Sequence, residues 1–173
     1  MRTAVFALLG TAALASGFGG AAASADDTAI LREAKDRAEI EALMWKYVRA
    51  LDSFDEESYA SVFTEDGQFG VGQNAEKGRP ALKKMIADLK KGRADREAAG
   101  QSKSPPMYHM ITNHSIEFVD QDHARYHGYW LTVFGAAGEN GMTRVAAAGQ
   151  EVDDLVRVDG KWLIKLRNVA AQE

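Results

Sequence analysis

Three polar side chains have the types and positions that acid–base chemistry uses: Tyr47, Asp52 and His109. Tyr47 lies on the apolar stripe of an expected helix, and Asp52 follows at its carboxyl end, where the helix dipole disfavours a carboxylate. His109 opens an expected strand, and alternation places it on one face with Ile111 and Asn113. If that face lines a pocket, the imidazole can meet the Asp52 carboxylate, with Tyr47 as a nearby hydrogen-bond donor.

Further side chains are expected to line the same pocket. Glu151 follows a run of small, apolar residues; it could act as a protonated donor, or it could pair with Arg144 or Arg167 for structural reasons. Trp130 lines the pocket if its strand alternates regularly. The sequence thus predicts four substrate-binding residues: Glu151, Asn113, Trp130 and Phe69.

The histidines and the missing cysteines restrict the chemistry further. His109 and His114 are an odd number of residues apart, so only one of them can face the pocket on a regular strand. His123 and His127 have the i, i+4 spacing of helical zinc ligands, but on the expected strand this spacing spans about 13 Å. The chain has no cysteine, which removes disulfides and thiolate chemistry. The sequence therefore predicts neither a metal site nor a cofactor.

The first 25 residues have the pattern of a secretory signal peptide. Arg2 precedes an apolar stretch, and Ala23-Ser24-Ala25 presents small residues at the positions that signal peptidase reads. We expect cleavage near Ala25 and export to the periplasm or the medium, with no membrane attachment afterwards. The 173 residues carry a formal net charge of −4, which argues against nucleic-acid binding. Residues 26–173 are expected to form a single domain.

The first half of this domain is predicted to be mostly helical. An apolar stripe predicts a helix from Thr28 to Leu51. A second, short helix is expected to start near Asp55 through a capping box of Ser53 and Glu56, and to continue through Phe63. A strand is expected over 68–71, and a third helix opens at 78–80. The polar segment 90–104 is expected to be a loop or a frayed helix end.

The second half reads as strands. Four segments are rich in β-branched and aromatic residues and are separated by short turns: 107–119, 123–136, 143–158 and 161–170. Helices first and an antiparallel meander second predict an α+β domain, with the helices packed on one face of a curved sheet.

Several stretches resemble one family in their order and spacing. They are Tyr47–Asp52, Tyr59–Gly67, Gly78-Arg79, His109–Asn113, Asp122–Ala124 and Asp154–Ile164, with Arg167 following. Over roughly residues 30–170 the chain resembles the SnoaL-like branch of the nuclear-transport-factor-like superfamily, with scytalone dehydratase, bile-acid dehydratase and polyketide cyclase relatives. The resemblance implies a cone-shaped, cystatin-like α+β barrel, in which a curved, mixed, mostly antiparallel sheet wraps three N-terminal helices. It also implies a deep apolar pocket and a homodimer formed through the outer sheet face.

The resemblance also implies roles for the three polar residues. Their arrangement is most similar to that of bile-acid dehydratase, with Asp52 orienting His109 and with Tyr47 stabilising an enolate. Glu151 is similar in position to the acid that stabilises the oxyanion in steroid isomerase and could assist Tyr47. The expected activity is that of a cofactor-free lyase or isomerase acting on an apolar, oxygenated compound such as a steroid, polyketide or terpenoid. A non-catalytic small-molecule-binding protein and a purely structural dimerisation module remain alternatives. A separation of more than about 6 Å between Asp52 and His109 would favour the binding protein.

Overall fold

The computed structural model describes residues 24–100, 104–136 and 141–171. The expected signal peptide therefore lies outside the described residues, apart from Ser24 and Ala25. Ser24 is the N-cap of helix α1 (Ala25–Ser53): its hydroxyl accepts from the Asp27 amide at 3.1 Å, and the Asp27 carboxylate accepts in return from the Ser24 amide. This capping box starts the helix three residues earlier than the apolar stripe predicts.

The structure differs from the sequence-based expectations in the cap of the second helix and in the length of the third. Helix α2 (Glu56–Ser61) is capped by Asp55, whose carboxylate accepts from the Ser58 amide at 3.0 Å. Ser53 makes no capping box with Glu56, because its hydroxyl donates instead to the Arg49 carbonyl oxygen at 2.8 Å. Helix α3 (Arg79–Ala98) continues through most of the segment expected to be a loop. Good helix formers and an i, i+4 ion pair between Lys91 and Asp95 at 2.5 Å stabilise this polar stretch.

The strands form one sheet of six, in the order β2-β1-β6-β5-β4-β3. Their bounds are β1 Phe63–Phe69, β2 Glu76–Lys77, β3 Met107–Phe118, β4 His123–Phe134, β5 Arg144–Val158 and β6 Lys161–Asn168, and a 3₁₀ turn, η1, spans Gly72–Asn74. Only β1 and β6 pair in parallel; the other neighbours are antiparallel. Strand β1 starts at Phe63, earlier than expected, because Phe63 pairs with Ile164 of β6 instead of extending the second helix.

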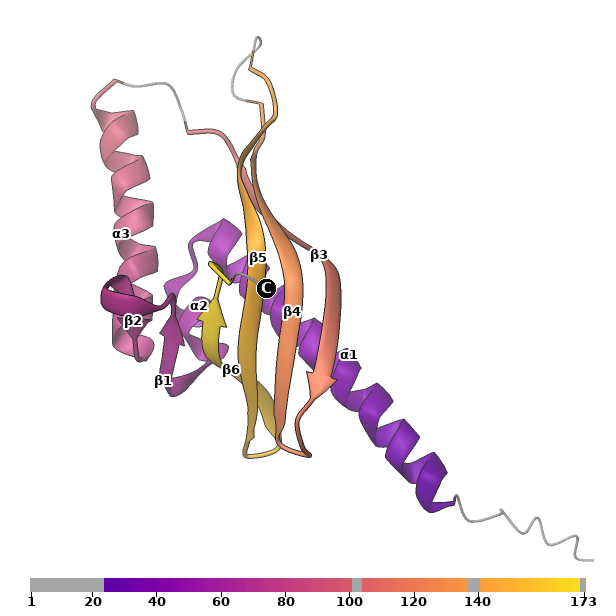
Figure 1. Cartoon of the computed structure of the whole chain (residues 1–173). Helices are drawn as coiled ribbons and strands as arrows, with labels where there is room; N and C mark the ends of the chain where they lie inside the picture. The colour runs from indigo at the N-terminus through magenta and orange to yellow at the C-terminus, as the bar shows by residue number, and fades with distance from the viewer. Residues whose placement is uncertain (1–23, 101–103, 137–140, 172–173) are drawn as a thin grey trace, which may run out of the picture.

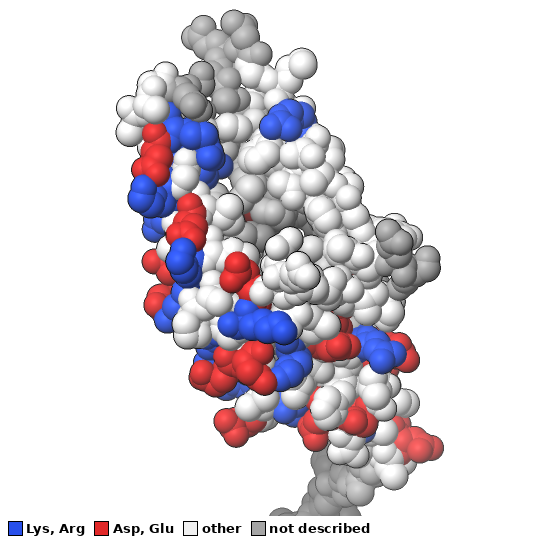
Figure 2. Space-filling view, turned by 60° about the vertical axis from the view of Figure 1, so that its left-hand side comes forward, with Lys and Arg blue, Asp and Glu red and all other residues white. Residues whose placement is uncertain are grey.

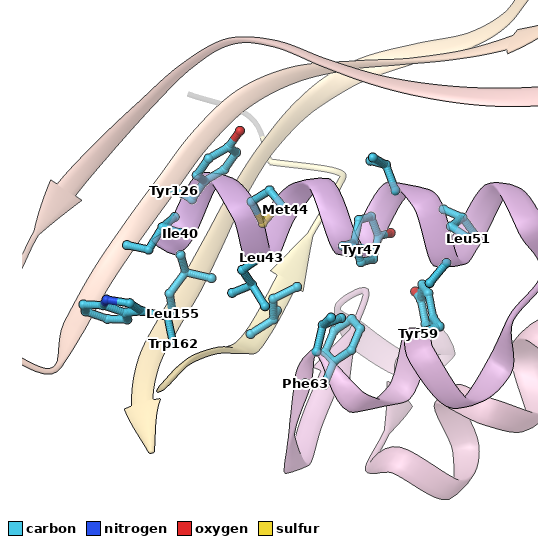
Figure 3. Close-up of a cluster of buried hydrophobic side chains, with 14 of the residues drawn as sticks. Ile40, Leu43, Met44, Tyr47, Leu51, Tyr59, Phe63, Tyr126, Leu155 and Trp162 are labelled. Carbon is cyan, nitrogen blue, oxygen red and sulfur yellow. The ribbon is translucent and has the colours of Figure 1, made fainter. Parts of the chain in front are cut away.

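The helices lie against the sheet. Figure 1 shows the long helix α1 crossing the sheet behind β3–β5, while α3 stands beside β1 and β2. The predicted stripe of α1 is buried and meets aromatic side chains of α2 and β1, so that Tyr47 lies 5.3 Å from Tyr59 and 6.1 Å from Phe63 between ring centroids (Figure 3). The prediction of an α+β fold with a mixed, mostly antiparallel sheet and helices packed against it is confirmed. Burying this stripe is the main force that holds α1 on the sheet.

Candidate functional site

Asp52 and His109 are in direct contact. Asp52 lies in the last turn of α1 and His109 near the start of β3, and the Asp52 Oδ1 is 2.7 Å from the His109 Nδ1. The same carboxylate accepts from the backbone amide of His109, at 3.0 Å to Oδ1 and 3.3 Å to Oδ2. These bonds join two elements 57 residues apart in the sequence. Both groups of the pair are therefore held in one geometry.

This geometry selects the state of the imidazole. A carboxylate only accepts hydrogen bonds, so the His109 Nδ1 carries a hydrogen and donates it to Asp52. In the neutral ring, Nε2 then has a free lone pair. Nε2 makes no hydrogen bond within the described parts of the chain, and His109 lines a cavity. The side chains of His109 and Asp52 are 18% and 19% exposed, so the pair is sheltered but reachable.

The cavity has two chambers, and His109 lies where they meet. The outer chamber has a volume of about 470 Å³ and the inner chamber about 220 Å³. Leu51, Phe69 and His109 line both. The apolar side chains among the other lining residues of the outer chamber include Met85 and Leu89 of α3, Met107 of β3 and Phe134 of β4. A ligand that fills either chamber would therefore lie against the imidazole.

The inner chamber is bounded by Tyr47, Trp130 and Arg167 among others. Trp130 presents its ring, because its indole N–H is already donated to the Val169 carbonyl oxygen at 3.0 Å. The ring fits because Gly149 pairs with Trp130 across β4 and β5; a Cβ at this glycine would approach the indole to 2.7 Å. Tyr47 is 2% exposed, and burial raises the pKa of its phenol, which keeps it a hydrogen-bond donor.

Arg167 belongs to a buried charge cluster behind the inner chamber, which also contains Glu151 and Asp153. Its guanidinium binds Glu151 at 2.5 Å and also binds Asp153, and it lies 4.1 Å from the centre of the Tyr47 ring. Asp153 also accepts from the Asn168 amide at 3.1 Å. Burial raises the pKa of the Glu151 carboxyl and raises that of Asp153 to about 7. Of these three residues, only Arg167 lines the inner chamber. Glu151 therefore does not line the chamber itself and affects it only through its ion pair with Arg167.

The other predicted site residues are placed as follows. Phe69 and Trp130 line the cavity. Asn113 does not: β3 is irregular between Thr112 and Ser115, Asn113 has a φ of 49°, and its side chain is exposed. The expected alternation of β3 is wrong from this bulge onwards, because the inserted residue shifts the faces of the strand.

The remaining histidines lie away from the cavity. His114 stacks on Tyr126 with ring centroids 5.3 Å apart, and it is 3.4 Å from Glu41. His123 bonds to Asp120 at 2.9 Å. Within residues 24–100, 104–136 and 141–171, no three His, Asp or Glu side chains come close enough to hold a metal ion.

Two groups of site residues were missed from the sequence. Asp153 is not among the predicted residues, although Glu151 and Asp153 are two residues apart on one strand face, opposite an arginine of the next strand. Such charges amid apolar residues signal a buried ion cluster. The arginines of the outer chamber, Arg93 and Arg96, fell in the segment expected to be a loop.

Comparison with known proteins identifies the class. The family profile of the SnoaL-like domain matches residues 32–168, and the chain belongs to this family. Solved structures of similar fold include an NTF2-like protein with a cystatin-like fold from Novosphingobium aromaticivorans (22% identity, 89% of this chain and 93% of that chain, TM-score 0.69). A protein of that organism assigned as a scytalone dehydratase is 26% identical over 80% of this chain and 85% of its own, with a TM-score of 0.61.

LinA is also similar, at 22% identity over 83% of this chain and 90% of its own, with a TM-score of 0.65. A search of curated proteins gives no match. The resemblance to the SnoaL-like branch is thus confirmed. Among the described helices, none has the length and apolar character needed to span a membrane.

Proposed function

We propose that this SnoaL-like protein is a cofactor-free lyase or isomerase in which His109 removes a proton from carbon. The observation that carries the proposal is the Asp52–His109 pair, with a 2.7 Å contact at Nδ1 and with the imidazole at the junction of two cavity chambers. Asp52 holds the tautomer that leaves Nε2 basic and stabilises the imidazolium that forms.

The reaction begins when Nε2 takes a proton from a carbon next to a substrate carbonyl. The C–H bonding pair moves toward the carbonyl, and negative charge develops on its oxygen. If the carbonyl points into the inner chamber, the Tyr47 phenol and the cationic Arg167 are the groups that meet this charge. If the enolate is conjugated with a second double bond, it takes the proton back from the imidazolium at the far carbon, which is isomerisation. Otherwise a leaving oxygen departs from the β carbon as the C=C bond forms, and the imidazolium returns the proton to that oxygen, which is elimination.

The apolar walls support an apolar, oxygenated substrate of the steroid, polyketide or terpenoid kind. They desolvate a bound ligand and strengthen its interactions with the few polar groups present. The similarity to a protein assigned as a scytalone dehydratase supports elimination of water as one outcome. The short Asp52–His109 contact favours an enzyme over a non-catalytic binding protein, because binding an apolar ligand needs no oriented base.

A probe that responds to any well-placed base can test this proposal before the substrate is known. 5-Nitrobenzisoxazole is neutral and aromatic, and removal of its C3 proton breaks its N–O bond and releases a coloured phenolate. We expect the wild-type protein to accelerate this reaction, and His109→Ala to lower the rate by at least about 100-fold. The matched control is His114→Ala, which removes a histidine of the same strand outside the cavity and should leave the rate within about twofold. Equal rates for wild type and His109→Ala would overturn the proposal.

Export and dimerisation are further proposals. Export is supported by the signal-peptide pattern of residues 1–25. Dimerisation through the outer sheet face is supported by three exposed side chains of β3 and β4 that point away from His109 and Trp130: Tyr108, Met110 and Tyr129, each 46–49% exposed. Sedimentation equilibrium of the protein should give twice the chain mass, and Met110→Glu should lower it toward one chain; a wild-type monomer would contradict the dimer.

A further inference from the structure

The outer chamber combines apolar walls with an unbalanced positive charge. Its lining includes Arg93 and Arg96 of α3 and Arg144 of β5, together with the ionisable His109. Within the described part of the chain, none of the lining residues of this chamber is acidic. The chain as a whole has a net charge of −4, so this accumulation opposes the overall charge.

Arg93 has a structural role at the chamber wall. Its guanidinium donates to the carbonyl oxygens of Ser104 and Pro105, at 3.1 Å and 2.8 Å, and lies 5.1 Å from the centre of the Phe54 ring. These contacts hold the segment before β3 against the end of α1. Carbonyl oxygens do not neutralise the cation, so its positive charge remains at the chamber.

Arg96 and Arg144 have guanidinium groups available to a ligand. Both are exposed, and neither makes an ion pair with a carboxylate of residues 24–100, 104–136 or 141–171. Arg144 lies 4.9 Å from the centre of the Phe134 ring, a contact that orients the group without using its N–H donors. By contrast, Lys84 and Lys91 on α3 are each paired with a carboxylate one turn away. In the view of Figure 2, basic side chains lie on two sides of the upper part of the drawn surface, with a largely uncharged surface between them.

We propose that the ligand of this cavity is an apolar molecule that carries an anionic group, a carboxylate or a phosphate ester. Its apolar body fills the outer chamber, and its anionic group is attracted by the positive charges that Arg96 of α3 and Arg144 of β5 place on the chamber wall. The guanidinium fork matches the oxygens of either anion and forms its strongest hydrogen bonds with them. A neutral terpenoid or steroid would leave these arginines without a partner. The inference rests on the proposed function only in taking the same cavity as the ligand site.

Two fluorescent probes that differ in a single charge can test this. 1-Anilinonaphthalene-8-sulfonate carries a sulfonate that N-phenyl-1-naphthylamine lacks, and the ring systems are the same. We expect the sulfonate probe to bind at least about tenfold more tightly at low salt, and this preference to shrink at high salt as surface charges are screened. Equal dissociation constants for the two probes, or no binding of either, would overturn the proposal.

A double variant tests whether Arg96 and Arg144 cause the preference for the sulfonate probe. Arg96→Gln with Arg144→Gln should raise the dissociation constant of the sulfonate probe about tenfold and change that of the neutral probe less than twofold. The matched control, Arg32→Gln with Arg125→Gln, removes the same charge from exposed positions outside the chamber lining and should leave the preference unchanged. An equal loss in both double variants would assign the preference to overall charge and overturn the site. Circular dichroism checks that each variant is folded. The single variants Arg96→Gln and Arg144→Gln should each lose part of the preference for the sulfonate probe.

Displacement of the probe then separates the two anions. Dodecanoate and dodecyl phosphate should both displace the sulfonate probe at lower concentration than dodecanol, and the better of the two identifies the anionic group. Displacement by dodecanol at the same concentration would contradict an anionic ligand. These measurements do not depend on turnover. A protein that prefers the anionic probe but does not open 5-nitrobenzisoxazole supports this inference and overturns the proposed function, and the reverse result does the opposite.

Discussion

Two groups of paired charges lie at the cavity, the Arg167–Glu151–Asp153 cluster and the Asp52–His109 pair, and they differ in what surrounds them. In the Arg167–Glu151–Asp153 cluster, all three side chains are at most 3% exposed and lie between the strands and α1. The Asp52–His109 pair is about one-fifth exposed and borders a cavity. The first arrangement closes charges off from water, whereas the second leaves one nitrogen free to react.

The difference shows how one fold uses charge for two purposes. Within the cluster, each carboxylate has the Arg167 cation as its partner, and the cation also faces the Tyr47 ring. Breaking such a cluster lowers the free energy of unfolding strongly, because removal of one partner leaves an uncompensated buried charge. Near the cavity, the carboxylate of Asp52 orients the neutral imidazole of His109, and its substitution should lower the stability of the fold only slightly. Mutations at the Asp52–His109 pair are therefore expected to lower activity with little loss of stability, whereas mutations in the cluster are expected to lower stability strongly.

The largest expected effect is on stability, from Arg167→Met. Methionine fills much of the arginine volume but leaves Glu151 and Asp153 buried without a cation, which should lower the free energy of unfolding by about 3–5 kcal/mol. Urea denaturation followed by tyrosine and tryptophan fluorescence measures the loss. The loss should shrink at low pH, where both carboxyl groups are neutral. The control is Arg125→Gln, which removes an exposed pair with Asp154 at 3.7 Å and should lose no more than about 1 kcal/mol. Equal losses would mean that burial does not distinguish the two arginines.

The second effect is on activity, from Asp52→Asn. Asparagine keeps the shape but loses the charge that stabilises the imidazolium, and its amide can donate to Nδ1 and reverse the tautomer. We expect the rate with 5-nitrobenzisoxazole to fall by about 10–100-fold. The urea midpoint should change much less than in Arg167→Met. A rate within about twofold of the wild-type rate would contradict a role of Asp52 in orienting His109.

The smallest effect is on the pH dependence of stability, from Asp153→Asn. Burial raises the pKa of Asp153 to about 7 from its ordinary value of 3.8. Between about pH 4 and pH 7, the folded protein therefore holds a proton that the unfolded chain has released, and this group makes the free energy of unfolding fall as the pH rises. In the variant this contribution to the pH dependence is absent. Its free energy of unfolding should therefore fall across the window by at least about 1 kcal/mol less than that of the wild type, since one pKa unit corresponds to about 1.4 kcal/mol.

The control for this prediction is Asp154→Asn, at the neighbouring, half-exposed position of the same strand. It should retain the wild-type slope. If Asp153→Asn also retains it, Asp153 is ionised throughout the window and Arg167 outweighs the effect of burial.

Much of the fold follows from local patterns in the sequence. The stripe of α1, the start of α2 near Asp55 and the four strands of the meander depend on neighbours a few residues away, so local periodicity and turn patterns predict them. The same patterns placed Tyr47 on a buried face, Asp52 at a helix end and His109 on a strand face. The SnoaL-like family was also recognisable from motifs in their order along the chain.

Only the tertiary structure decided which of these residues meet. The bulge near Asn113 turns that residue away from the cavity, and no local pattern signals where a strand gains a residue. The cross-strand register brings Asp153 opposite Arg167, and the continuation of α3 brings Arg96 to the chamber that Arg144 lines from β5. The sequence by itself determined which elements form and which side chains could act. The pairing of those side chains depends on contacts between residues far apart in the chain, and these exist only once the sheet and helices have packed.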